Sequence, residues 1–136
     1  MEQIHGIATE LGLLSGRDCV YLDRVEGDGW GTLVLTGEIN GALASRPSWD
    51  WVPYRLAFQG VLACFSCELD TYEALAGPQA WEGSSFAWIE NSAWLAGLPV
   101  REDLPKGEYR HYRLLTYDIA YHVIAVSYHL EVERLE

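Results

Sequence analysis

The clearest pattern of apolar and polar positions lies near the C-terminus, where the two kinds of residue alternate. One side of this segment has Ile124, Val126, Tyr128, Leu130 and Val132, and the other has Ala125, Ser127, His129, Glu131 and Glu133. A period of two residues is typical of a β-strand with one face in the core and the other in water. We expect a further strand over Tyr109–Tyr117.

A helix is the alternative for part of this C-terminal region. Helical spacing links Leu114, Tyr117, Tyr121, Ile124 and Tyr128. The β-branched content favours strands, because branched side chains lose rotamer freedom in a helix and pack well on a pleated sheet.

A hairpin is predicted closer to the N-terminus. Its arms, 19–25 and 32–39, flank Glu26-Gly27-Asp28-Gly29, a turn whose glycines can adopt positive φ. In the second arm one face has Leu33, Leu35 and Ile39, and the opposite face has Thr36 and Glu38.

Residues 52–62 predict another strand, in which one side has Val52, Tyr54, Leu56 and Phe58. Pro53 cannot donate a ladder hydrogen bond, so it confines this end to a sheet edge or a strand start. Gln59-Gly60 interrupts the alternation, which indicates a bulge or a bend.

Three short helices are predicted. The first has Ile4, Ile7, Leu11 and Leu14 at helical spacing before Ser15-Gly16, with a strand as the alternative. The second begins with the capping box Asp70-Thr71-Tyr72-Glu73 and ends at Gly77-Pro78. The third is capped by Asn91 or Ser92 and ends at Gly97.

These elements predict one globular domain over residues 1–136. Its fold class is α+β and mainly antiparallel β: a curved sheet or open barrel of about six strands with two or three short helices. No long helices alternate with the strands, so a doubly wound parallel sheet is excluded.

The charge of the chain limits its partners. It has 9 Lys and Arg against 20 Asp and Glu, a net charge of −11 at pH 7. Such a protein is repelled by phosphate backbones and anionic lipid, so we expect neither nucleic acid nor membrane binding. A basic protein partner would be attracted; the alternative is that the charge only maintains solubility.

The cellular location is predicted from absent signals. The opening MEQIHGIATELG has neither a basic nor an apolar region of a signal peptide, and no apolar run is long enough for a membrane helix. Three cysteines make no disulfide framework. We therefore expect a cytoplasmic protein with reduced thiols.

Cys64-Phe65-Ser66-Cys67 has the spacing of a redox or metal motif, but its context favours structural cysteines. Glu68 and Asp70 lie nearby and would raise a thiol pKa. Residues three apart on a strand face opposite sides, and no second such pair completes a zinc site.

The histidines show no metal-ligand spacing. A hairpin turning near Asp118 would bring His111 and His122 close together, and we expect them to be surface or interfacial polar residues. No nucleophile elbow or phosphate-binding loop is present, so no catalytic residue, cofactor or metal is predicted.

One segment has a biased composition. Leu56–Val100 has no Lys, Arg or His, but five acids and three tryptophans. Aromatic residues are enriched at binding hot spots, and carboxylates attract a cationic partner. The predicted partner-binding residues are Trp81, Glu82, Trp88, Glu90, Trp94 and Glu73. The alternative is that the tryptophans fill the core and the acids form its rim.

In style the chain resembles bacterial immunity proteins of toxin systems, which are small, acidic and rich in tryptophan. The segments that prompt this are Trp81-Glu82-Gly83-Ser84-Ser85-Phe86, Ile89-Glu90-Asn91-Ser92 and Tyr112-Arg113-Leu114-Leu115-Thr116-Tyr117-Asp118. The resemblance implies a cytosolic protein that binds another protein, and it assigns no functional residue.

Two functions are therefore carried forward. The first is a non-enzymatic domain that binds a protein partner, a basic one being an option that its charge favours, with a homodimer through an edge strand as a variant. The second is a small enzyme or ligand-binding barrel with an aromatic-lined pocket and Glu90 or Asp118 as acid or base.

Overall fold

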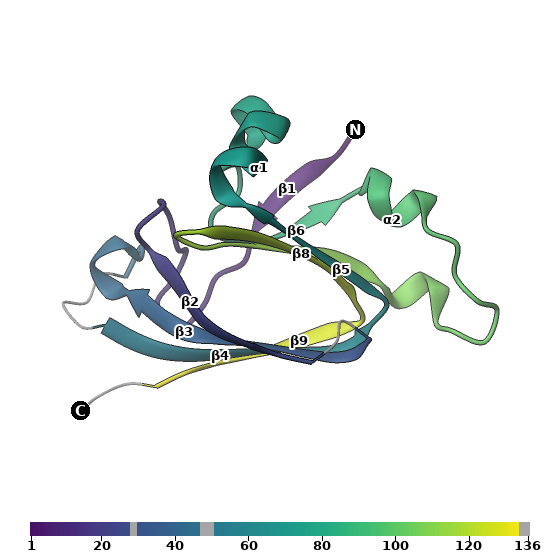
Figure 1. Cartoon of the computed structure of the whole chain (residues 1–136), viewed down its shortest axis with the longest axis horizontal. Helices are drawn as coiled ribbons and strands as arrows, with labels where there is room; N and C mark the ends of the chain where they lie inside the picture. Colours follow the sequence, from purple (N-terminus) through teal and green to yellow (C-terminus); the bar gives the residue numbers. More distant parts are fainter. Residues whose placement is uncertain (28–29, 47–50, 134–136) are drawn as a thin grey trace.

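Two antiparallel β-sheets lie face to face in the computed structural model (Figure 1), which describes residues 1–27, 30–46 and 51–133. Five strands form one sheet in the order β1-β6-β7-β8-β5, and four form the other in the order β2-β3-β4-β9. The strands are β1 (Gln3–Gly6), β2 (Val20–Glu26), β3 (Gly31–Asn40), β4 (Trp51–Val61), β5 (Ala63–Glu68), β6 (Phe86–Glu90), β7 (Arg110–Leu115), β8 (Ile119–Ala125) and β9 (Ser127–Val132).

The sheets are connected by a bent two-stranded ribbon. One arm of the ribbon is β4 followed by β5, and the other is β8 followed by β9. Each arm passes from one sheet into the other. The bend lies at Gly60, which has φ 65°, and at Val126, whose N–H donates to the carbonyls of Gln59 and Gly60. The predicted break at Gln59-Gly60 is thus confirmed, and Pro53 lies near the start of β4.

The bend changes which residues face the core. In β9 the core side is Tyr128, Leu130 and Val132, but in β8 it is Val123 and Ala125. The uninterrupted alternation predicted from residue 124 to 133 is therefore wrong at Ile124. The extra residue is Gly60 on the β4–β5 arm, because Val126 N–H lies opposite both Gln59 and Gly60. As a result, the core side of the β8–β9 arm shifts by one residue at Val126.

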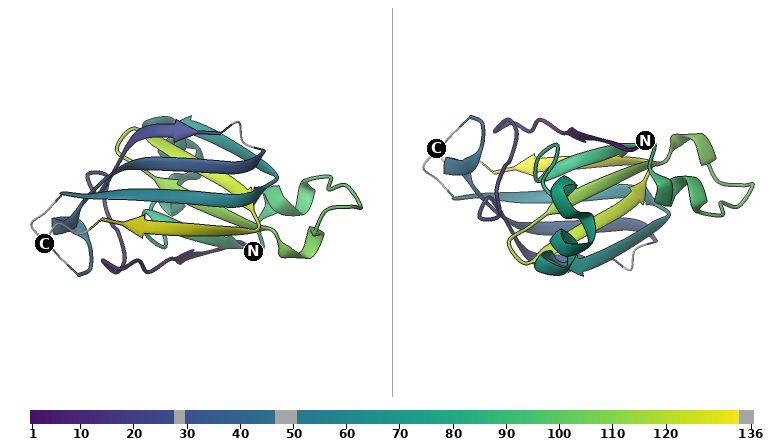
Figure 2. Two further views of the ribbon diagram at one scale, coloured as in Figure 1. Left: turned by 90° about the horizontal axis from the view of Figure 1, so that it is seen from below. Right: turned by 90° about the horizontal axis from the view of Figure 1, so that it is seen from above.

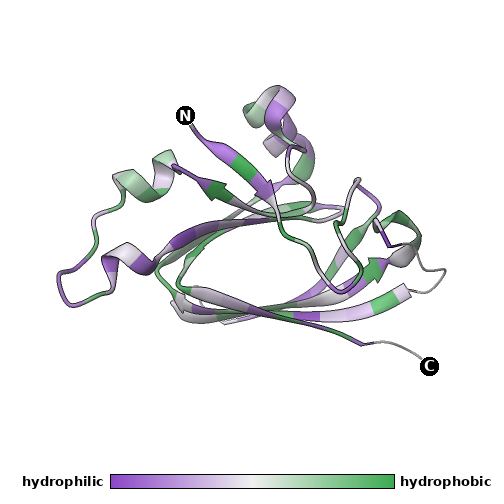
Figure 3. Cartoon of the chain, turned by 180° about the vertical axis from the view of Figure 1, so that it is seen from behind, coloured by the Kyte–Doolittle hydropathy of each residue, from purple (hydrophilic) through white to green (hydrophobic). Residues whose placement is uncertain are grey.

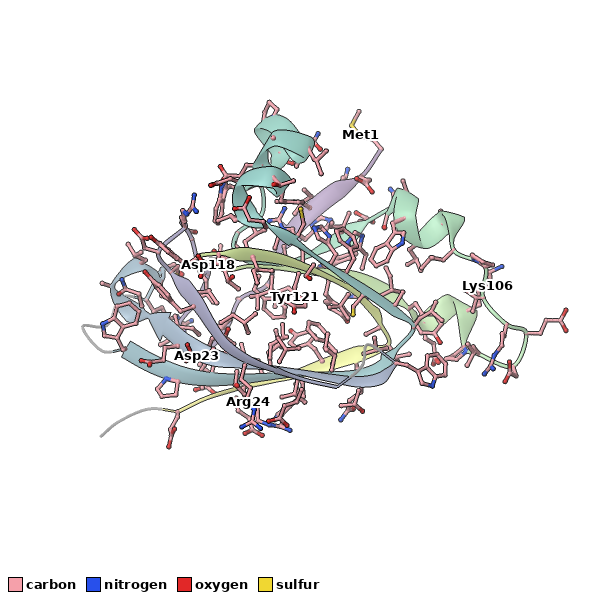
Figure 4. All side chains as sticks on the ribbon, in the orientation of Figure 1. Met1, Asp23, Arg24, Lys106, Asp118 and Tyr121 are labelled. Carbon is pink, nitrogen blue, oxygen red and sulfur yellow. The ribbon has the colours of Figure 1, made fainter. Side chains whose placement is uncertain are left out.

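The core fills the space between the sheets. Figure 4 shows Tyr121 pointing into it, and Figure 3 shows hydrophobic and hydrophilic positions following one another along the strands. The faces predicted for β3 and β4 are confirmed: they bury Leu33, Leu35, Ile39, Val52, Tyr54, Leu56 and Phe58. The cavity among the core residues has a volume of only about 10 Å³.

Two short helices accompany the five-stranded sheet. Helix α1 (Leu69–Ala76) lies over its outer face, where Leu69 packs with Leu115 and Ala120. Helix α2 (Ala93–Gly97) follows β6. Three 3-10 turns, η1 (Gly41–Leu43), η2 (Gly77–Gln79) and η3 (Lys106–Glu108), complete the described elements.

The helix caps agree in part with the predictions. The Ser92 side chain accepts a hydrogen bond from Leu95 N–H and caps α2, as one of the two predictions has it. The cap of α1 is Glu68 rather than Asp70, because its carboxylate accepts from Asp70 N–H and Thr71 N–H. Gly77, with φ 65°, ends α1 as predicted.

The predicted N-terminal helix is wrong, and its strand alternative holds. β1 pairs with β6, with Ile4 opposite Ile89, and Ile7 N–H donates to Phe86 carbonyl. Pairing satisfies the exposed edge of β6, which a helix could not do. The strand count exceeds six because β1, β5 and β6 were not among the predicted strands and because the corner divides the predicted C-terminal alternation between β8 and β9. Asp28 and Gly29 of the predicted turn lie outside the described residues.

Gly37 marks the closest approach of β2 to β3. A Cβ on it would lie 1.9 Å from the Tyr21 carbonyl oxygen, which also accepts a 2.9 Å hydrogen bond from the Tyr54 hydroxyl. We expect Gly37→Ala to lower the free energy of unfolding by about 2 kcal/mol, measured by urea denaturation. Gly107→Ala, whose Cβ would meet nothing within 4 Å, is the control. Equal effects of both variants would contradict this close packing.

Candidate functional sites

The six residues predicted to bind a partner do not lie on one surface. Trp88 packs against the core between the sheets, and its ring stacks on His5 at 4.6 Å. The guanidinium carbon of Arg110 lies 4.6 Å from the centroid of the Trp88 ring. Glu90 binds the Nε2 of His5 at 2.9 Å. These residues belong to the inner face of the five-stranded sheet and its β1 edge.

The remaining predicted residues lie on the outer face or on its helices. Trp94 of α2 contacts Phe65 at 5.0 Å between ring centroids, and Trp81 packs against the Leu69 cluster. Glu73 lies on α1, 3.9 Å from Arg17, and Glu82 is exposed. All three tryptophans are half-buried, so each packs against the sheet instead of joining the others in a single patch.

A different set of acids and aromatics does come together, on the outer face of the four-stranded sheet. Tyr21 and Asp23 of β2, Glu38 of β3 and Trp51 of β4 line an open hollow of about 360 Å³, hereafter the acidic–aromatic hollow. Tyr21 lies directly opposite Glu38 in the β2–β3 register. An irregularity between Leu22 and Arg24 shifts this register at Asp23.

The aromatic rings of the hollow continue towards the turn between β7 and β8. The Tyr21 ring meets Trp51 edge-on at 5.3 Å and stacks on Tyr117 at 5.1 Å. Trp51 is 47% exposed and Tyr117 39% exposed, so both present apolar ring area to solvent.

The surroundings of the hollow are negative. Burial raises the pKa of Tyr21, and the charges of Asp18 and Asp118 raise it further. Figure 4 shows Asp23 and Asp118 at the same end of the molecule. One cationic side chain of the protein already contacts the Tyr117 ring: the Arg17 guanidinium lies 5.4 Å from its centroid.

A second constellation lies on the outer face of the five-stranded sheet. His111 of β7 and His122 of β8 are 2.7 Å apart, His111 Nε2 to His122 Nδ1. The Nδ1 of His111 is 2.7 Å from the Ser92 hydroxyl. We call Ser92, His111, His122 and their neighbour Arg113 the polar chain; all four side chains are buried.

Aromatic side chains cover the polar chain. Phe65 stacks on His122 at 4.6 Å with the rings nearly parallel, Trp94 meets His111 edge-on at 5.2 Å, and Tyr72 of α1 lies 5.1 Å from His122. Burial and the charge of Arg113 together lower the pKa of His111 to about 4. Burial, His111 and Arg113 together lower the pKa of His122 to about 3. Both rings are therefore neutral at pH 7.

The proximity of His111 and His122 is predicted by the sequence, but their predicted surface position is wrong. The β7–β8 hairpin turns at Thr116–Ile119 and places them on one face. The helices and Phe65 that cover them come from a distant segment, 65–94, so the sequence of the hairpin alone carries no sign of burial.

The C-x-x-C prediction is confirmed in its geometry. On β5, Cys64 packs towards the core between the sheets, whereas Cys67, three residues further along the strand, lies on the opposite side. Both thiols are free, as is Cys19, and burial raises the pKa of Cys64. The raised pKa disfavours the reactive thiolate.

In residues 1–27, 30–46 and 51–133, no group of three His, Cys, Asp or Glu side chains could hold a metal ion. No helix in the same ranges has the length and apolar character needed to cross a membrane. Comparison with protein families, curated proteins and solved structures finds no match to the chain.

The lowered histidine pKa values predict how stability depends on pH. In the unfolded chain both histidines titrate near 6.5, so below that pH the unfolded state binds more protons and the folded state loses stability. Between about pH 6.5 and 5, the free energy of unfolding should fall by about 1.4 kcal/mol per pH unit for each histidine. Urea denaturation across this range measures it.

The control for this pH dependence is His129, which is 66% exposed and pairs with Glu131. We expect His122→Gln to reduce the slope of stability against pH, and His129→Gln to leave it unchanged. A slope that His122→Gln does not alter would contradict the assignment.

Proposed function

We propose that this chain is a non-enzymatic protein-binding domain whose acidic–aromatic hollow receives an Arg or Lys side chain of a basic partner. The observation that carries the proposal is the hollow itself: two carboxylates, Asp23 and Glu38, beside the rings of Tyr21 and Trp51. A cation between carboxylates and ring faces gains both ion pairing and cation–π attraction.

The charge of the chain supports this choice of partner. A net charge of −11 attracts a basic protein and speeds its encounter. The position of Arg17 over Tyr117 supports the chemistry, because it places a guanidinium on the neighbouring ring. Arg17 is itself held by Asp70 at 2.6 Å, so it is not available to fill the hollow without breaking that pair.

The location proposed for this function is the cytoplasm. Cys19, Cys64 and Cys67 are all free thiols, which supports a reducing compartment. An immunity-type role, in which the partner is a basic toxin, fits the same charge and remains part of the proposal.

The enzyme alternative receives less support. Neither of its two candidate acids lines the cavity between the sheets. Glu90 pairs with His5, and Asp118 is exposed in the β7–β8 turn. The cavity between the sheets is small and lined by Tyr54 and seven aliphatic or aromatic neighbours, without an acid. We therefore propose no reaction.

Isothermal titration with a short arginine–glycine peptide tests the hollow directly. We expect Glu38→Gln to weaken binding about threefold to tenfold at low salt, because one desolvated charge contact is lost. Trp51→Leu should weaken it by about tenfold through the lost ring face. Raising the salt concentration should weaken binding to the unaltered protein.

Matched controls separate the hollow from general acidity. Glu102→Gln removes the same charge from an exposed residue that does not line the hollow, and Trp30→Leu removes a tryptophan that is 54% exposed. Both should bind the peptide as the unaltered protein does. If Glu102→Gln weakens binding as much as Glu38→Gln, the attraction is non-specific and the hollow is not the site.

A further inference from the structure

The guanidinium of Arg113 is buried without an ion-pair partner among the described residues. The side chain is 0% exposed, and among the described residues no carboxylate lies within ion-pair distance of it. An arginine remains charged inside proteins, and burying an unpaired charge is costly. Arg113 therefore requires compensation that the described side chains do not supply.

The hydrogen bonds of Arg113 are also incomplete. Its Nη2 donates to the carbonyls of Glu82 and Ser84 at 2.5 and 2.7 Å, but Nε and Nη1 have no acceptor. Burial lowers the pKa of Arg113, and the nearby Tyr72 side chain and the charge of Glu82 raise it in part, but neither satisfies Nε or Nη1. Three N–H groups of the guanidinium are consequently buried with no partner.

The polar chain ends in another unsatisfied group. The Ser92 hydroxyl accepts a hydrogen bond from Leu95 N–H, and its other contact is His111 Nδ1. The hydroxyl hydrogen therefore forms a hydrogen bond only by donating to that nitrogen. His111 then carries its hydrogen on Nε2 and donates to His122 Nδ1. Neutral His122 must carry its own hydrogen on Nε2, which is buried and has no acceptor.

The unsatisfied donors belong to neighbouring side chains. Arg113 and His122 are directly opposite in the β7–β8 register, and Tyr72 from α1 lies against His122 and near Arg113. Figure 2, right, looks onto this face, with α1 in front of the sheet. Buried donors gathered beside one positive charge and facing no acceptor are the chemistry of an anion site.

We infer that Arg113 and His122 bind a small inorganic anion of halide size under Phe65, Tyr72 and Trp94. Its size follows from burial: Arg113 is 0% and His122 4% exposed, so only a small anion could reach these donors while the covering rings stay in place. Its route of entry is past Phe65, which covers His122 and is itself 43% exposed. This site is independent of the acidic–aromatic hollow, which lies on the other sheet.

The test uses the intact protein and chloride as the probe. We expect the ³⁵Cl NMR line of sodium chloride to broaden in the presence of the protein and to narrow again when bromide competes. The thermal unfolding midpoint should be higher in sodium chloride than in sodium gluconate at equal ionic strength, because an anion that binds only the folded state stabilises it.

Variants locate the site. His122→Phe keeps an aromatic ring beneath Phe65 but removes the N–H donor, and Arg113→Gln removes the charge; each should weaken chloride binding by about tenfold. Arg110→Gln, on the same strand but over Trp88, is the control and should bind as the unaltered protein does. If Arg113→Gln fails to fold, His122→Phe and the unaltered protein still decide the question.

Two results would overturn the inference. One is the absence of both line broadening and chloride-dependent stabilisation in the unaltered protein, which would mean that water satisfies these donors. The other is broadening that persists unchanged in His122→Phe, which would place the anion elsewhere.

Discussion

The bend of the β4–β5 and β8–β9 ribbon is the constraint on which the rest of the structure depends. Without the extra residue Gly60 and its positive φ, both arms would continue in one flat sheet. With the bend, each arm contributes to two layers, and the apolar side of β4 faces that of β8 across the core. The bend also reverses which residues of β8 point outward, and so places His122 on the outer face of the five-stranded sheet.

The two outer faces that result differ in electrostatic character. The four-stranded sheet has an open outer surface, where strand register gathers carboxylates and rings around Tyr21. The five-stranded sheet has its outer face partly covered, and there a buried guanidinium and two neutral histidines lie under aromatic side chains. Charge is thus left in solvent on one side and confined at low dielectric on the other, and we propose a cationic partner for the first and an anion for the second on this basis.

Local patterns predicted much of the fold, and tertiary contacts decided the rest. The alternation of Leu33, Leu35 and Ile39 identified the core face of β3, and the glycine at position 60 marked the bend. The N-terminal strand was predicted only as the alternative to a helix, because helical spacing of a few apolar residues carries no information on the edge of β6 that it must cover. The sites were harder to predict: the hollow draws on three strands, and the cover of His122 comes from α1, α2 and β5. The hairpin register offered a usable signal, since it places Tyr21 opposite Glu38 on the solvent side.

We propose above that the open acidic–aromatic hollow recognises a cationic side chain. The most direct measurement is a two-dimensional NMR titration with an arginine–glycine peptide, following the backbone amides and the tryptophan indole N–H signals. If the hollow binds the peptide, the largest chemical-shift changes should be at the Trp51 indole and at the amides around Tyr21, Asp23 and Glu38. The Trp94 indole signal should not change. Shifts centred on Trp94 or Trp81, or spread evenly over the acidic surface, would contradict it.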